Sequence, residues 1–336
     1  MVSAGSPSVS HDPLCSRAYY GYLHTGDREF GESSLKTVLA IIGYWDMHRS
    51  IDGLVRDLHT VFVDWGSHIY SYGKGSTGPT GALCTFNSFY AYALRLTGKL
   101  AGYLGRHTGA VELEQKAEET LVSIRDKMFI DDLGLYRDGI ENDFAWNNLS
   151  PTANAAAVLA GASPEEEGRA VLHNCFDKQK FPDVIPANAL VVWHVLHALF
   201  SAHCDDLAFR WLKDTFGHMA DAGPGTLWET VQRHSSQCQG TGSGPVHIIS
   251  RYVAGLFPME PGYQKIGIDL HPGDLTAFSC SLPTINGIVD IDWKRRNGRI
   301  DYVLKLPHTL TGREVVNVSE NVEMNFRVEL RAHQMS

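Results

Sequence analysis

The sequence predicts a mainly α-helical domain of antiparallel hairpins, followed by a small antiparallel β-sandwich. Three observations support this fold class. From about residue 15 to 257, apolar residues recur at the spacing of amphipathic helices. Short Gly-, Asp- and Pro-rich segments separate these stretches, which favours αα-hairpins. After residue 257 the apolar residues alternate in short runs, as they do in strands. We therefore expect two domains, 1–257 and 258–336.

The helical pattern is clearest in residues 34–51 and 81–105, where apolar side chains fall on one face. Ser163 and Pro164, followed by three glutamates, form a helix start with a cap, a proline at the first position and acids in the first turn. The sequence has no GxGxxG, no P-loop and no alternation of helix and strand, which disfavours nucleotide-binding α/β folds. Further helices are expected at 110–128, 152–161, 164–174, 187–203, 205–219 and 244–256.

The C-terminal part contains six short strand-like runs, which Gly, Pro or Asn turns separate. Asn297-Gly298 is a strong signal for a two-residue hairpin turn. The runs therefore predict an antiparallel sandwich. They read YQKIGIDL, AFSCSLP, GIVDIDWKR, GRIDYVLKLP, REVVNV and NVEMNFRVEL.

Composition restricts the class of protein and its partners. With 43% hydrophobic and 20% charged residues, the 336-residue chain is typical of a globular protein. Its net charge of −9 disfavours binding to nucleic acid and to anionic membranes. No apolar stretch reaches the length of a membrane span, so we expect no membrane insertion.

The N-terminus and the cysteines predict the compartment. The segment MVSAGSPSVSHDPL lacks the basic and apolar regions of a secretory signal. The six cysteines are scattered without a CxxC, a pattern that favours free thiols in a reducing compartment. We therefore expect a cytoplasmic protein. The sixteen histidines show no ligand spacing such as HExxH, so we expect neither a metal site nor a cofactor.

Several motifs resemble those of one enzyme family, in the same order along the chain. ADAGPGTLWE, GSGPVHIISRYVAGLFPMEPGYQKIGIDLHPGDL and LPTINGIVDIDWKR resemble the C-terminal half of α-L-rhamnosidases of glycoside hydrolase family 78. Upstream, GDREF, VFVDWG, NSFYAYALRLTGKLAGYLG and LSPTANAAAVLAG resemble the helical domain of that family. The resemblance implies an (α/α)6 barrel, here incomplete, because we count about eight helices where a closed barrel has twelve. An open barrel edge would expose apolar side chains, so a homo-oligomer that covers it is an expected partner.

The resemblance implies that Glu229, in the motif TLWE, is a catalytic residue. Inverting glycosidases use a general acid and a general base, and Glu229 matches the base of the family. The acidic loop that supplies the acid has no counterpart in this sequence. From the residues alone, the favoured interpretation is that Glu229 is exposed after its loop and has no catalytic role.

The expected sugar pocket departs from the family pattern. Where the family has Ser-His-x-His-Gly-Trp, this chain reads SQCQGT, so that Gln239 stands in place of a histidine. An acidic, aromatic loop also contains Asp138 and Glu141, and one of its acids could replace the missing general acid. For each candidate the alternative is a packed ring or a solvated side chain. The substrate-binding candidates are Trp228, Asp64, Trp65, Gln239, Asp143 and Trp146.

Three functions remain open from the sequence. The first is an inverting glycoside hydrolase that resembles α-L-rhamnosidases and acts on a small-molecule or oligosaccharide ligand, with turnover impaired by the missing acid. The second is an acid/base enzyme, such as an isomerase, lyase or cyclase, built on the same scaffold. The third is a non-catalytic carbohydrate-binding remnant. We favour the hydrolase because TLWE is retained.

Overall fold

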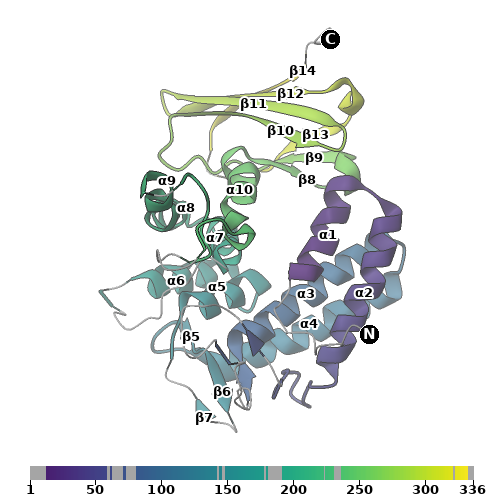
Figure 1. The fold of residues 1–336 in the computed structure, drawn as a ribbon, viewed down its shortest axis with the longest axis vertical. Coiled ribbons are helices and arrows are strands. Elements are labelled where there is room, and N and C mark those ends of the chain that lie inside the picture. Colours follow the sequence, from purple (N-terminus) through teal and green to yellow (C-terminus); the bar gives the residue numbers. More distant parts are fainter. Residues whose placement is uncertain are drawn as a thin grey trace. The chain divides into compact units, whose positions relative to one another are not determined.

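The computed structural model describes residues 13–58, 61–62, 71–72, 81–141, 144–145, 148–177, 179–180, 191–222, 224–230, 236–320 and 322–331 (Figure 1). The chain divides into two compact units. The first comprises Met1–Ala18 and Ser33–Pro245, and the second comprises Tyr19–Glu32 and Val246–Ser336. The tip of the first helical hairpin therefore groups with the C-terminal sheets. The boundary at 257/258 stays a prediction.

Helices that follow one another in the chain make up most of the first unit, and the facing ends of the first two helices belong to the second unit. A short turn joins α1 to α2, α3 to α4, α5 to α6 and α7 to α8, and Gly105 (φ 82°) and Gly161 (φ 90°) supply the left-handed backbone that two of these turns require. The helices are α1 (Pro13–Thr25), α2 (Arg28–Asp46), α3 (Cys84–Tyr103), α4 (His107–Met128), α5 (Pro151–Ala160), α6 (Glu165–Phe176), α7 (Val192–Ser201), α8 (Asp205–Leu212) and α9 (His218–Ala222).

Burial separates these helices into two layers. Sixteen of the twenty residues of α3 are buried and eight of the ten residues of α5, whereas α4 buries six of twenty-two. α3 packs on α4 and α5, α5 packs on α6 and α7, and α7 packs on α8. α3, α5 and α7 therefore form an inner row, and α4, α6 and α8 form an outer row whose exposed faces are mainly polar.

The structure confirms the helical character of the predicted segments and corrects some boundaries. α2 begins at Arg28 and ends at Asp46, not at 34 and 51. The helix expected at 205–219 is interrupted by a π-turn at Lys213–Gly217. The helix expected at 244–256 is α10 (Gly244–Ile248) continued by a π-turn at Ile249–Val253.

The loops of the helical domain contain short strands that the sequence did not predict. Each strand has only two or three residues, too few to show a period in the sequence, and β3 pairs with β6 from more than fifty residues further along the chain. They form three small sheets: β1 (Val61–Phe62) with β2 (Ser71–Tyr72), β4 (Phe129–Ile130) with β5 (Leu135–Tyr136), and β3 (Ala82–Leu83) with β6 (Gly139–Glu141) and β7 (Phe144–Ala145).

Two buried asparagines hold these loops against the inner helices. Asn87 is the fourth residue of α3; its Oδ1 accepts from the Val55 N–H at 2.7 Å, and its Nδ2 donates to the Val55 carbonyl at 3.0 Å. Asn154 is the fourth residue of α5 and makes the same pair of bonds to Tyr136, at 2.8 and 3.0 Å. Each Nδ2 also donates to the carbonyl four residues back. Successive hairpins therefore repeat one amide clamp.

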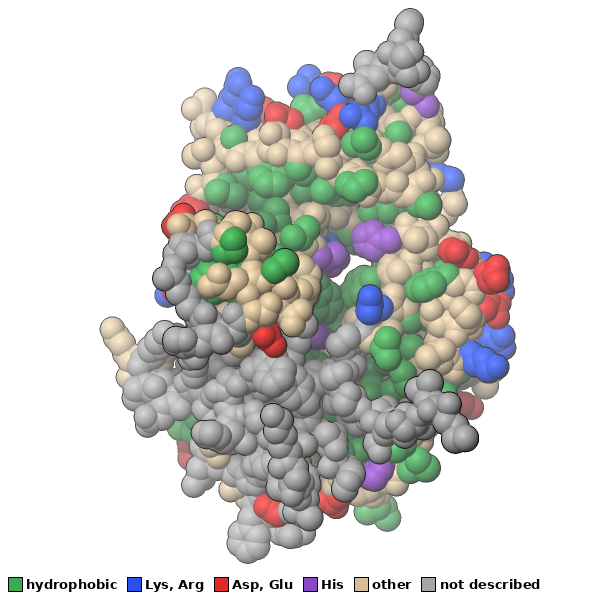
Figure 2. Space-filling view, in the orientation of Figure 1, with side chains coloured by type: hydrophobic (Ala, Val, Ile, Leu, Met, Phe, Trp, Pro, Cys, Tyr) green, Lys and Arg blue, Asp and Glu red, His purple; other side chains and the backbone are tan. Residues whose placement is uncertain are grey.

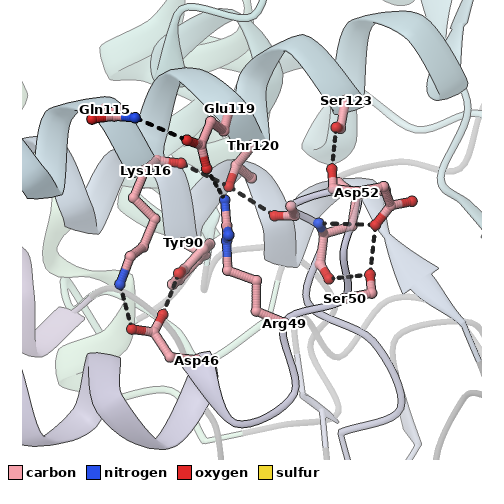
Figure 3. A network of polar contacts seen from close by, with 12 residues as sticks. Asp46, Arg49, Ser50, Asp52, Tyr90, Gln115, Lys116, Glu119, Thr120 and Ser123 are labelled. Atoms are coloured by element: carbon pink, nitrogen blue, oxygen red, sulfur yellow. Dashed lines mark hydrogen bonds and ion pairs between the residues drawn. The ribbon is translucent and has the colours of Figure 1, made fainter.

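A polar network ties the chain after α2 to α4 (Figure 3). Asp46 accepts hydrogen bonds from the Tyr90 hydroxyl and from Lys116 Nζ, the latter at 2.5 Å. Arg49 pairs with Glu119 at 2.8 Å. These contacts fix the end of α2 relative to α3 and α4.

Asp52 is the centre of the second half of this network. Its carboxylate lies 2.7 Å from Lys127 Nζ and 2.6 Å from Arg56, and it accepts from the Ser50 hydroxyl at 2.5 Å. Burial opposes ionisation of Asp52, but the hydrogen bonds from Lys127, Ser50 and Arg56 outweigh burial and hold its pKa well below the usual value. The ionised carboxylate therefore stabilises the loop.

The second unit contains two sheets. One has the strand order β10-β11-β12-β14 and the other the order β13-β9-β8. Alternation along β11 and β12 buries one face of the first sheet, including Trp293 and Tyr302, whose polar atoms donate to the carbonyls of Val253 and Ala254 at 2.9 and 2.7 Å. The strands are β8 (Leu256–Pro258), β9 (Lys265–Ile268), β10 (Ala277–Thr284), β11 (Gly287–Arg296), β12 (Arg299–Leu306), β13 (Glu314–Asn317) and β14 (Met324–Leu330).

The prediction of a purely antiparallel sandwich is wrong in two of the strand pairs. β14 pairs with β12 in parallel, and β13 pairs with β9 in parallel. The chain leaves β12, contributes β13 to the other sheet and only then returns as β14, so β14 arrives in the direction of β12. The predicted hairpin is present, because Asn297 (φ 50°) and Gly298 (φ 81°) form the turn between β11 and β12.

The tip of the first hairpin packs within the second unit. His24 Nδ1 lies 3.0 Å from the Tyr263 hydroxyl, and the His24 ring is 6.3 Å from the His247 ring. Gly26 approaches Gly262 so closely that a Cβ on Gly26 would lie 3.2 Å from the Gly262 Cα. Within the described residues, no helix has the length and apolar character needed to cross a membrane.

Candidate active site

The TLWE motif forms one side of a tight pairing with the segment that follows it. The Glu229 N–H donates to the Ser236 carbonyl at 2.9 Å, and the Gln239 N–H donates to the Leu227 carbonyl at 3.0 Å. The Thr226 hydroxyl also donates to a carbonyl of the opposite segment. Three contacts therefore hold residues 226–229 against 236–239.

The Glu229 side chain is half-buried and oriented by this pairing. Its Oε2 accepts from the Ser236 N–H at 3.3 Å. No other described residue is hydrogen-bonded to the carboxylate. A carboxylate held by one backbone donor keeps acceptor capacity for a further proton donor such as water. This arrangement suits a general base.

Trp228 belongs to this pairing, and its side chain is fully buried. Gly242 permits this packing, because a Cβ at that position would lie 2.4 Å from the Trp228 carbonyl oxygen. A ring without exposed surface offers no face for a sugar to stack on. Burial therefore favours the packing interpretation of Trp228, and its substrate contact stays a prediction.

Gln239 lies on the same pairing as Glu229 and is half-buried. The structure therefore brings Glu229, Trp228 and Gln239 together. Ser236, whose N–H orients Glu229, was not among the residues predicted from the sequence. Ser236 acts through its backbone N–H, which nearly every residue type carries, so the residue type gives no signal for this role.

Two acids of the predicted acidic loop lie among the described residues. Asp138 is fully buried, and its Oδ1 accepts from the Ser150 hydroxyl at 2.7 Å. The main chain of Asp138 bonds to Cys84 and Asn148 at 2.9 Å each. Asp138 therefore anchors the loop to the starts of two helices. Glu141 is half-buried at the end of β6.

Two family models cover almost the whole chain. The model described as the bacterial alpha-L-rhamnosidase six-hairpin glycosidase domain matches residues 12–254, and that of the bacterial alpha-L-rhamnosidase C-terminal domain matches residues 255–329. The chain belongs to the bacterial α-L-rhamnosidase family. Its helical domain is therefore a six-hairpin glycosidase domain, as the resemblance implied.

Individual relatives agree with the assignment to the α-L-rhamnosidase family. An alpha-L-rhamnosidase of Alteromonas sp. (strain LOR) is 23% identical over 310 residues, which are 86% of this chain and 32% of the relative. The glycoside hydrolase family 78 rhamnosidase of Bacillus sp. GL1 has a similar fold, with a TM-score of 0.80, 18% identity and coverage of 95% of this chain and 34% of its own. The α-L-rhamnosidase of Dictyoglomus thermophilum gives a TM-score of 0.66 at 20% identity, covering 85% and 32% of the two chains. The chain spans about a third of the length of these relatives.

Four of the predicted substrate-binding residues lie outside the described part of the chain. They are Asp64, Trp65, Asp143 and Trp146. Asp57 and Gly81, which flank the segment that carries Asp64, are described, and they are hydrogen-bonded to each other. The Gly81 N–H donates to Asp57 Oδ1 at 2.6 Å, and the Asp57 N–H donates to the Gly81 carbonyl at 3.2 Å. This reciprocal pair fixes the base of the segment on the inner row of helices.

The described residues of the family member contain no group of three or more His, Cys, Asp or Glu side chains that could hold a metal ion. Buried thiols are also poor nucleophiles here. Burial, with the nearby charge of Asp138, raises the pKa of Cys84 far above its usual value. In the pairing of residues 226–229 with 236–239, Glu229 supplies the carboxylate.

Proposed function

We propose that this chain hydrolyses α-L-rhamnosides with inversion and that Glu229 is the general base. The observation that carries the proposal is the Glu229 carboxylate, half-buried and held through Oε2 by the Ser236 N–H. The family of the chain and the α-L-rhamnosidase activity named for its relatives supply the substrate class.

In this mechanism the free acceptor capacity of Glu229 takes a proton from a water molecule. The water attacks the anomeric carbon of the rhamnoside on the face opposite the leaving group. Ser236 keeps the carboxylate in one rotamer, which reduces the loss of entropy on reaching the transition state. We assign no general acid, so we expect cleavage to depend strongly on how well the leaving group departs without protonation.

The first experiment measures hydrolysis of p-nitrophenyl α-L-rhamnoside by the full chain. The nitrophenolate leaves with little acid assistance, so the step that needs Glu229 is isolated. Glu229→Gln should lower kcat/KM by roughly 10²- to 10⁴-fold, the usual contribution of a general base. Nuclear magnetic resonance of the fresh product should show the inverted anomer.

A matched control is Glu112→Gln, which changes the same group on the exposed surface of α4. It should leave kcat/KM unchanged, and both variants should keep the melting temperature of the parent. Unchanged turnover in Glu229→Gln, or a product with retained configuration, would overturn the proposal.

A second series replaces nitrophenol by phenol as the leaving group. If no general acid acts, the rate should fall steeply as the pKa of the leaving group rises. Binding of L-rhamnose without turnover of any aryl rhamnoside would favour the carbohydrate-binding alternative. Neither binding nor turnover would favour a different acid/base reaction.

The cytoplasmic location belongs to this proposal. All six cysteines lie in the described part of the chain and are free thiols, four of them buried. Free thiols fit a reducing compartment.

A further inference from the structure

The outward face of the sheet β10-β11-β12-β14 is hollowed in its middle. Two grooves of about 420 and 390 Å³ adjoin there and share Asp292 and Val303 in their lining. The grooves arise because short side chains, such as Val303 and Ser279, lie among long Lys and Arg side chains. The opposite face of the sheet is packed, so this face is open to a ligand.

The carboxylates that line the grooves are largely satisfied by their neighbours. Of the three aspartates, Asp290 pairs with Arg331 at 2.8 Å and accepts from the Ser281 hydroxyl at 2.6 Å. Asp301 accepts from Asn325 Nδ2 at 2.8 Å. Their negative charge is therefore partly neutralised within the sheet.

More basic than acidic side chains line the grooves, and the basic side chains have on average fewer ion-pair partners than the aspartates have. Five Lys and Arg side chains line the two grooves against three Asp side chains. Among the described residues, no carboxylate lies within 4.0 Å of the exposed Lys294, Lys305 or Arg327. Basic side chains gather over this sheet in the space-filling view (Figure 2). An acidic chain of net charge −9 therefore presents a locally positive surface.

The shape of this surface fits a polymer better than a single ion. The lining runs along β11 from Asp290 to Arg296, which at about 3.3 Å per residue is roughly 20 Å. The strand register places Lys305 opposite Asp290, and Lys294 opposite Asp301. Cations therefore recur along the groove, with Ser and Asn groups between them that can bond to hydroxyls.

We propose that this sheet face binds an acidic polysaccharide. Lys294, Lys305 and Arg327 pair with its carboxylate or sulfate groups, and Ser279 and Asn325 bond to sugar hydroxyls. The site lies on the sheets of the second unit, and its binding does not require Glu229. It would hold a charged polymer that carries the sugar to be cleaved.

The experiment measures binding of polygalacturonate, dextran sulfate and neutral dextran to the full chain by affinity electrophoresis. Polygalacturonate tests carboxylate groups, dextran sulfate tests sulfate groups, and neutral dextran tests the sugar alone. We expect retardation by at least one of the two acidic polymers and none by neutral dextran. The apparent Kd should rise with salt, since exposed charge pairs are screened.

The double variant Lys294→Gln/Arg327→Gln should weaken binding roughly tenfold, because it removes two charge-assisted contacts. The control Lys36→Gln/Lys99→Gln makes the same change of net charge at exposed positions of α2 and α3 and should bind like the parent. Equal weakening by both pairs, equal retardation by neutral dextran, or no retardation at all would overturn the proposal. Melting temperatures establish that each variant is folded.

Discussion

Asn87 and Asn154 show how single residues set the geometry of this fold. Each is fully buried and makes three hydrogen bonds to backbone groups, two of them to a residue outside its own helix. A buried backbone N–H and carbonyl that lose their partner cannot turn to water. These amides therefore hold loop segments in place as a strand would.

Replacing Asn154 by Ala should lower the free energy of unfolding by about 3 kcal/mol, because three buried hydrogen bonds are lost at about 1 kcal/mol each. Urea unfolding followed by circular dichroism measures this change. Asn148→Ala, at an exposed side chain of the same loop, should change stability by less than about 0.5 kcal/mol. Equal effects of the two variants would contradict the clamp.

The sequence singles out Glu229 as a candidate but gives no indication of these amides. Glu229 belongs to a short contiguous motif, and its backbone pairing with Ser236 spans seven residues. Asn87 and Asn154 bond to residues 32 and 18 positions away, and nothing in the residues around either asparagine marks its partner. Ser236 was missed for a related reason, because any residue can supply a backbone N–H.

At the scale of elements, the hydrophobic periodicity predicted those helices and strands whose apolar side chains recur at a regular spacing. α3 to α6 and the strands β10 to β12 lie where the apolar pattern placed them, since each buries one continuous face. The parallel pairing of β14 with β12 was not predictable in this way. Alternation is the same in both directions, so it does not encode strand direction.

The docked tip of the first hairpin is an element whose stability should depend on pH. Burial, with the charges of His24 and Arg251, lowers the pKa of His247 from 6.5 to about 4, and burial also lowers the pKa of His24. As the pH falls, the unfolded chain therefore binds protons at His24 and His247 at a higher pH than the folded chain does. The contribution to stability is complete above pH 6.5 and is lost as the pH falls from 6.5 towards 4.

We expect the free energy of unfolding to fall by up to about 1.4 kcal/mol for each pH unit in this window from His247 alone. His247→Gln, which cannot be protonated, should flatten that part of the profile of stability against pH. The exposed His107 provides the matched control, and His107→Gln should leave the profile unchanged. A parent profile that is flat between pH 6.5 and 4 would refute the coupling.

At the scale of the whole molecule, the surface of α2 exposes apolar side chains that a second copy of the chain could cover. Leu39 is 42% exposed and Met47, just beyond the end of α2, is 73% exposed, with Ala40 and Gly43 also exposed between them. Small residues beside larger apolar ones let another helix approach closely. The homo-oligomer expected from the sequence stays a prediction, and these α2 side chains are where we test it.

A second copy of the chain that covers this surface would make sedimentation depend on concentration. We expect sedimentation velocity to show a monomer at low concentration and a larger species as the concentration rises. Leu39→Glu/Met47→Glu should keep the monomer at every concentration, because charges would be buried without partners in the contact. The control Val111→Glu/Val122→Glu places the same charges on exposed apolar positions of α4 and should associate like the parent, since that helix faces solvent as an outer-row element. A parent chain that is monomeric throughout would show that the α2 surface is tolerated in water, as scattered apolar side chains are in many proteins.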